Sequence, residues 1–385
     1  MDVFLPMLPL MVQAAPPPAP PEEITIVGRR AEQGLAACLQ RSCPPPEEIE
    51  AALQASVEQF ADGRYVDARR TLRGAIDRNR DHAAELPGPV SSLYATVATV
   101  AEHEGETAIW RMAARKSVTV LRRHLGETNS ATLVQELSLG DSMVGLGLTR
   151  AATNSYRAVQ RKATESGQPK LAANAAFRRA WLALNLGRSK EAERFADEAV
   201  AIAGPDDRQM AELREVLRTR TAIRRGDDGA LDALAARLRQ SATVKPQLLF
   251  TPPLAGINPA MTGADGQAWH DSRLRFADVG YWIRPDGRTA EVEVLRNSGL
   301  GDWAPGFLHH VSARRYTPLD VEPGQPGIYR IDRFTMRANK GTSIGTRIRH
   351  PVGKPSVYVV DLTETDAMSA AHRQRTEEAL GPLDN

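Results

Sequence analysis

The chain has 385 residues, of which 42% are apolar and 25% charged, and its formal net charge is +2. These values are ordinary for a folded protein of two or three domains. They argue against a protein that binds nucleic acid or an anionic membrane through a strong overall field.

Residues 1–15 are predicted to form a signal peptide. The apolar run from Val3 to Val12 is shorter than the roughly 20 residues that a membrane span requires, and a small-residue cleavage pattern ends at Ala14. Asp2 occupies a place where a basic residue is usual, so a disordered cytosolic tail is the alternative. We therefore expect export to the periplasm and no stable membrane span.

Residues 16–49 form a proline-rich linker with a short strand and a cysteine pair. The strand is predicted at Ile24, Thr25, Ile26 and Val27, which are all β-branched and stand alone between prolines and a glycine. A lone strand requires the edge of another sheet. This segment resembles the short box by which outer-membrane receptors engage the energy transducer TonB, which implies a partner-binding role. Pairing with this chain's own C-terminal sheet, or disorder, is the alternative.

Cys38 and Cys43 are the only cysteines. On a helix their spacing would place both thiols on one face, and a cysteine pair behind an export signal favours a local disulfide. Free thiols are the alternative. Two cysteines without a neighbouring histidine are too few for a zinc site.

A ladder of five glycines marks residues 50–240, at Gly63, Gly105, Gly147, Gly187 and Gly226. Such regular steps indicate a repeat array. In the best copy, helices are predicted over Leu171–Leu186 and Glu191–Ala203, with a turn between them and a stop at Gly204-Pro205. Small residues recur seven positions before each glycine, and alanine stands five positions after three of them: Ala68, Ala152 and Ala192. Trp110 and Leu231 depart from that pattern.

These positions resemble the tetratricopeptide repeat (TPR), in its kinesin-light-chain-like spacing. The resemblance implies an α solenoid of helix-pair repeats with a concave binding face. Gln135, Asn174 and Arg178 are the candidate partner-binding residues, with Asp141 beside them, although a merely solvated face is an equal alternative. Solvated faces are also predicted for His103, His124, Arg69-Arg70 and Arg224-Arg225.

A linker is predicted over residues 241–270, followed by a small α+β domain over 271–365 and a polar tail over 366–385. Strands are expected at Arg275–Arg284, Thr289–Arg296 and Gly327–Arg337, a helix at Trp303–Arg314, and a further strand at Val357–Leu362. The order, with its Asp-Gly and Ser-Gly turns and the Tyr316-Thr317-Pro318 exit, resembles the C-terminal domain of the TonB family.

Three side-chain expectations follow within this domain. One of His309 and His310 should pack while the other is exposed, because adjacent helical residues point in different directions. Arg314-Arg315 and Arg333 are predicted to be a solvated face.

No catalytic or cofactor motif of the HExxH, GxSxG, P-loop or GxGxxG type is found. The prediction is therefore a non-enzymatic periplasmic interaction module without cofactors or metal. Its partners would be cell-envelope proteins or peptides, with TonB-dependent receptors among the candidates. The alternative is a TonB-family energy transducer that couples the inner membrane to receptor transport.

Overall fold

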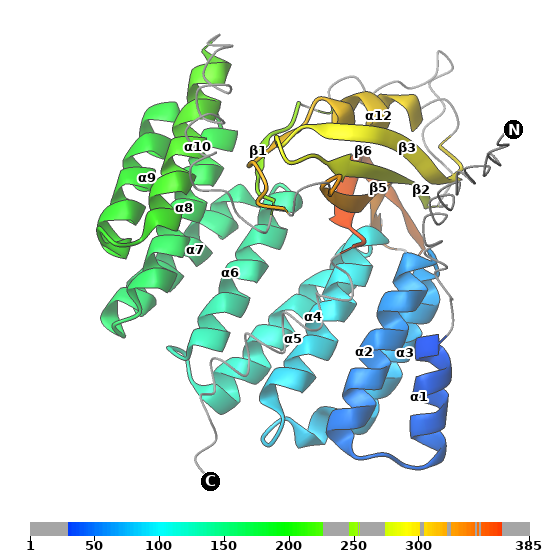
Figure 1. Ribbon diagram of the computed structural model, residues 1–385. Helices are drawn as coiled ribbons and strands as arrows, with labels where there is room; N and C mark the ends of the chain where they lie inside the picture. Colours follow the sequence, from blue (N-terminus) through cyan, green and yellow to red (C-terminus); the bar gives the residue numbers. More distant parts are fainter. Residues whose placement is uncertain are drawn as a thin grey trace, which may run out of the picture.

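The computed structural model describes residues 30–225, 246–252, 254, 274–300, 304–321, 325–342, 345 and 348–363. It consists of a helical part followed by a small α+β part, as expected (Figure 1). The predicted signal peptide, the Ile24–Val27 strand, Gly226, Leu231 and the C-terminal tail lie outside the described residues.

The helical part is a succession of paired helices joined by tight turns (Figure 1). The four turn glycines that are described, Gly63, Gly105, Gly147 and Gly187, all have φ between 74° and 76°. Only glycine adopts this conformation at little cost, which explains the ladder. The helices are α1 (Arg30–Gln40), α2 (Pro45–Ala61), α3 (Tyr65–Asn79), η1 (Arg80–His82), α4 (Pro87–His103), α5 (Thr107–Leu125), α6 (Ser130–Gly145), α7 (Thr149–Glu165), α8 (Pro169–Asn185), α9 (Ser189–Ala203) and α10 (Arg208–Arg224).

Small buried residues allow the helices of a pair to pack closely. Ala68, Ala152 and Ala192 have no exposed surface. A Cβ built on Gly140 of α6 would lie 2.5 Å from the Tyr156 ring of α7. Trp110, which departs from the alanine pattern, is also buried and joins the core of the first two pairs.

The residue 16–49 linker proved partly helical, because α1 covers Arg30–Gln40 and packs on α2. Cys38 and Cys43 lie at disulfide distance, with Cα atoms 5.2 Å apart. They do not share one helix face, however. The helix ends at Gln40, and the chain turns through Ser42, whose φ is 53°, before Cys43.

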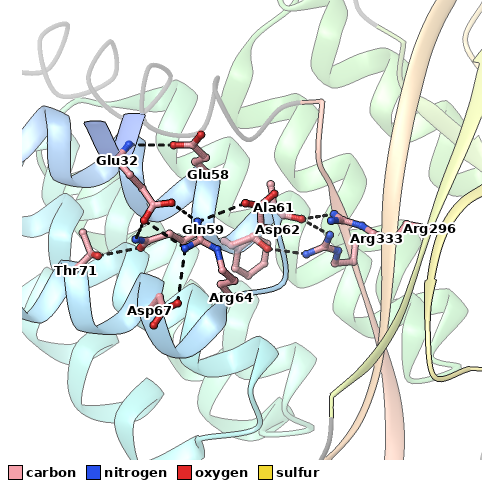
Figure 2. Close-up of polar contacts among 11 residues, drawn as sticks. Glu32, Glu58, Gln59, Ala61, Asp62, Arg64, Asp67, Thr71, Arg296 and Arg333 are labelled. Carbon is pink, nitrogen blue, oxygen red and sulfur yellow. Dashed lines mark hydrogen bonds and ion pairs between the residues drawn. The ribbon is translucent and has the colours of Figure 1, made fainter. Parts of the chain in front are cut away.

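Helix α1 is held to α2 and α3 by a polar network around Glu32 (Figure 2). The Glu32 carboxylate accepts hydrogen bonds from Gln59 and Arg64, and its backbone amide donates to Glu58. Gln59 in turn accepts a hydrogen bond from Thr71 of α3. The network therefore ties the first three helices into one unit.

The α+β part contains an antiparallel four-stranded sheet in the order β3-β2-β5-β6. Its strands are β2 (Arg275–Ile283), β3 (Thr289–Ser298), β5 (Ile328–Thr342) and β6 (Arg349–Asp361), and α12 (Ala304–Ser312) packs on β2 and β3. Phe307 of α12 stacks on Phe334 of β5, with ring centroids 4.6 Å apart. As predicted, His310 is buried and His309 is exposed.

Two features of this part were not expected from the sequence. A short strand β1 (Leu248–Phe250) arises within the predicted 241–270 linker and pairs with β4 (Arg315–Tyr316). Strands β5 and β6 also run beyond their predicted limits, and their pairing extends to Thr342 and Arg349. Part of the stretch between the two predicted strands therefore continues the same ladder of strand pairing.

The sheet packs against the turn ends of the first two helix pairs (Figure 1). Two arginines of β5 make the contact, and Figure 2 shows one of them, Arg333. Arg333 donates to the carbonyl oxygen of Phe60 at 2.7 Å and also to that of Ala61, at the end of α2. Arg337 donates to the carbonyl oxygen of His103 at 3.0 Å, at the end of α4. The last carbonyls of a helix lack intrahelical donors and carry a partial negative charge, so these guanidinium groups cap both helices.

Several residues predicted to be solvated are therefore buried, and those predictions were wrong. His103 lies in the interface, where its ring meets Phe60 at 5.0 Å between centroids. Arg333 is fully buried and bonded to Asp278. Arg69 is largely covered and pairs with Glu104.

Arg314 is likewise buried, in an ion pair with Asp332 inside the sheet domain. His124, Arg70 and Arg225 are exposed, as expected. The buried arginines share one property that a local sequence pattern does not reveal: each has an acceptor from a distant part of the chain.

Candidate functional site

A groove of about 580 Å³ lies between α6, α8, α10 and the beginning of β1. Most of its lining is apolar, and a few polar groups stand among the apolar side chains. This composition is typical of a binding site. The lining residues are Asp141, Val144, Tyr156, Asn174, Phe177, Arg178, Trp181, Leu182, Asn185, Leu213, Val216, Gln247 and Leu248.

A polar cluster occupies one part of the groove and joins α6, α7 and α8. The Asp141 carboxylate accepts a hydrogen bond from the Tyr156 hydroxyl at 2.7 Å and one from Nε of Arg178 at 3.0 Å. Burial, reinforced by the hydrogen bond to Asp141, raises the pKa of Tyr156. The phenol therefore remains a neutral donor, and the Arg178 charge is matched by Asp141.

Aromatic side chains from α8 form the apolar part. Phe177 and Trp181 lie one helical turn apart with ring centroids separated by 6.2 Å. The guanidinium of Arg220, from α10, lies 4.3 Å from the Trp181 ring centroid and donates to the Leu249 carbonyl of β1 at 2.8 Å. Arg220 therefore connects strand β1, at the edge of the groove, to helices α8 and α10.

Two of the three partner-binding residues predicted in the helical part lie together in this groove. Asn174 and Arg178 lie one turn apart on α8, and Asp141 faces Arg178 from α6. The Asn174 amide donates to the Lys170 carbonyl oxygen at 3.0 Å. Gln135 lies elsewhere: it is buried, and its amide donates to the Ser117 hydroxyl at 3.2 Å between α5 and α6.

The sequence did not predict two sets of groove residues: the aromatic side chains of α8, and the residues at or next to β1 on the groove's edge. The three- and four-residue spacing of Phe177 and Trp181 within the predicted helix Leu171–Leu186 indicates one apolar helix face, but not that a groove exposes one side of both rings. Gln247 and Leu248 lie in a stretch predicted to be a linker. The apolar run Leu248–Phe250 is too short to indicate a strand.

In comparisons with known proteins, no family model matches the chain and no curated protein matches it significantly. Among the described helices, none has the length and apolar character needed to cross a bilayer. The described residues likewise contain no group of three metal-ligating side chains.

The arrangement can bind but offers little reactive chemistry. Its carboxylate is doubly hydrogen-bonded, its phenol is a donor and its guanidinium is paired. What remains is an apolar surface edged by groups that form hydrogen bonds, which suits the side chains and backbone of an extended polypeptide.

Proposed function

We propose that this chain is a non-enzymatic interaction module whose helix pairs form a TPR-like solenoid. Its groove binds a segment of a cell-envelope protein in the periplasm. The observation that carries the proposal is the apolar groove on the first helices of two successive pairs, which contains Asn174, Arg178 and Asp141. The resemblance of residues 271–365 to the TonB C-terminal domain supports the envelope location.

The energy-transducer alternative requires an exposed sheet edge that pairs with a receptor strand. Strand β3 is an outer strand of the sheet, and Leu295 on it is 46% exposed. Its pairing with β2 shifts register twice, between Asp278 and Val279 and between Gly280 and Trp282. Such bulges hinder the addition of a further strand, so we favour the groove over this edge.

Site-specific photocrosslinking in the native envelope tests the proposal. A benzophenone amino acid at Asn185 or Leu213, both in the groove, should capture a discrete partner whose crosslinked segment mass spectrometry can identify. The matched control is the same probe at Val66, which is 55% exposed on α3 outside the groove. Absence of groove-specific crosslinks would reject the proposed function.

Fractionation of the same cells tests the location. We expect the mature protein in the soluble periplasmic fraction. Recovery with the inner membrane would instead favour the transducer alternative.

A further inference from the structure

A hollow between α7 and α8, away from the groove, is lined mainly by polar and charged side chains. Its volume is about 350 Å³. None of the described residues lines both the hollow and the groove, so it is a separate candidate site, which we call the arginine hollow. The lining residues are Arg157, Gln160, Arg161, Thr164, Glu165 and Arg179.

Arg179 occupies a position that is apolar in the earlier copies of the repeat. It stands eight residues before its turn glycine, and the residues at the same position are Ala55, Val97 and Leu139. Ala55 and Val97 are buried, and Leu139 packs against the core. The Arg179 side chain is only 12% exposed, so its charge carries a desolvation cost that packing of the helix pairs does not require.

Within the described chain, the guanidinium of Arg179 is only partly satisfied. Its Nη1 atom donates to the Gln160 side-chain oxygen and lies 3.5 Å from the Glu198 carboxylate. That carboxylate also accepts a hydrogen bond of 2.6 Å from Gln160. The Nε atom is buried without an acceptor, whereas Nη2 is not buried and forms no hydrogen bond with a described residue. Nη2 is therefore available to an acceptor that enters the hollow.

Two further guanidinium groups lie close to Arg179. Arg157 is exposed, and among the described residues no carboxylate pairs with it. Arg194 of α9 and Arg179 stand on the same Phe195 ring, at 5.0 and 3.9 Å from its centroid. Burial, together with the like charges of Arg157 and Arg194, lowers the pKa of Arg179. A negative charge in the hollow would relieve this repulsion.

The charges around the hollow do not balance. Its lining holds three arginines and one glutamate. Glu165 pairs with Arg161 at 3.8 Å, and both side chains are exposed. The neighbouring charges of Arg194 and Glu198 offset each other, so three positive charges against one negative charge leave a surplus of two. A dianion matches this surplus, whereas a single carboxylate would leave half of it.

A phosphate monoester has the chemistry that these groups recognise. It carries about 1.5 to 2 negative charges at pH 7 and three strong acceptor oxygens. Guanidinium groups bind such oxyanions through paired, charge-assisted hydrogen bonds.

We propose that the arginine hollow binds a phosphate monoester. Nη2 of Arg179 contacts the phosphate from below, and Arg157 and Arg161 contact it from the edge of the hollow. Two sources share this chemistry: a soluble phosphate ester, and a phosphatidate headgroup in a bilayer. The proposal does not depend on what the groove binds.

Isothermal titration calorimetry of the full chain with methyl phosphate tests the proposal. The matched control ligand is methyl sulfate, which has the same shape and a single negative charge. At constant ionic strength we expect methyl phosphate to bind about tenfold more tightly, because only the dianion matches the surplus charge.

Two substitutions at one position of the repeat locate the binding. Arg157 and Arg115 each stand ten residues after a turn glycine, and both are exposed. Arg157→Gln removes a charge from the hollow and should weaken methyl phosphate about tenfold. Arg115→Gln, on α5, should leave the affinity unchanged.

Arg179→Leu installs the residue that the preceding copy has at this position, Leu139. It should abolish binding of methyl phosphate. The ligand should therefore raise the denaturation midpoint of the unmodified chain and leave that of this variant unchanged.

Vesicle flotation distinguishes the two sources. Phosphatidylcholine vesicles carry either phosphatidate, a monoester, or phosphatidylglycerol, a singly charged diester. Capture by the phosphatidate vesicles alone would support a membrane headgroup as the ligand. Binding of methyl phosphate without such capture would support a soluble ester. No binding of methyl phosphate, equal affinity for methyl sulfate, or indifference to Arg157→Gln would each overturn the proposal.

Discussion

Two adjacent residues at the end of α4 have pKa values that burial shifts with opposite consequences for stability. Burial raises the pKa of Glu102 to about 7, with Arg337 partly offsetting the shift. Burial, together with Arg337 and Arg333, lowers the pKa of His103 to about 3. Folding thus favours the neutral form of both residues, and each side chain makes the interface sensitive to pH over a different range.

The sign of each effect follows from proton binding. The folded chain binds more protons at Glu102 between its ordinary pKa of 4.5 and about 7, so stability falls as pH rises through that range. At His103 the unfolded chain binds more protons between about 3 and 6.5, so stability rises with pH there. From about 4.5 to 6.5 the two contributions oppose each other.

We predict that Glu102→Gln stabilises the protein above pH 7, by about 2 to 3 kcal/mol, and has little effect at pH 4. The variant should also reveal the rise in stability with pH that His103 causes. Denaturant unfolding across this pH range measures both effects. Glu85→Gln, at a site where the side chain is 79% exposed, is the control. A stability difference for Glu102→Gln that does not vary with pH would contradict the assignment.

The turns between paired helices are the elements that the sequence predicts best. A positive φ requires glycine at each of them, so the ladder could be detected without any knowledge of packing. What covers each turn could not be predicted in the same way. Gly105 and Gly147 have the same φ of 74°, yet only Gly105 contacts β5.

This pair of glycines allows the contact to be separated from the backbone strain. Gly147→Ala should cost about 1 to 2 kcal/mol of unfolding free energy, from the left-handed conformation alone. Gly105→Ala should cost about 1 to 3 kcal/mol more, because its Cβ would meet the Ala338 carbonyl oxygen at 2.6 Å and displace the strand. Denaturant unfolding of both variants measures the difference. Equal losses in the two variants would show that β5 does not depend on this turn.

At the scale of the whole molecule, the sequence indicated two parts but not how they join. The local sequence predicts a solvated Arg333, because its acceptors, Phe60 and Ala61, precede it by more than 270 positions. Only part of the groove could be predicted, for a related reason. Asn174 and Arg178 follow from the face of one helix, whereas the rim at Leu248 exists only because the chain returns to that helix. Local periodicity carries no information about such returns.

The interface should make the two parts unfold together. Arg333 bridges Asp278 of β2 and the end of α2 while fully buried, so the parts share a desolvated charge network. Trp110 lies in the helical core and Trp282 in β2. In protein labelled with 5-fluorotryptophan, we predict that the ¹⁹F signals of these two residues report the same denaturation midpoint.

Arg333→Met should separate those midpoints, with the Trp282 signal changing at lower denaturant. Loss of one partner of a buried ion pair costs about 3 to 5 kcal/mol, and here that loss falls on the contact between the two parts. Arg296→Met is the matched control, since Arg296 bonds to the same Asp278 and Ala61 with its side chain 43% exposed. Because solvent screens the half-exposed Arg296 guanidinium and the buried Asp278 keeps Arg333 as its partner, the loss of Arg296 should cost only about 0 to 1 kcal/mol. This control should therefore keep the midpoints together. If the two midpoints already differ in the unmodified protein, the sheet and the helical part unfold independently, and the prediction is wrong.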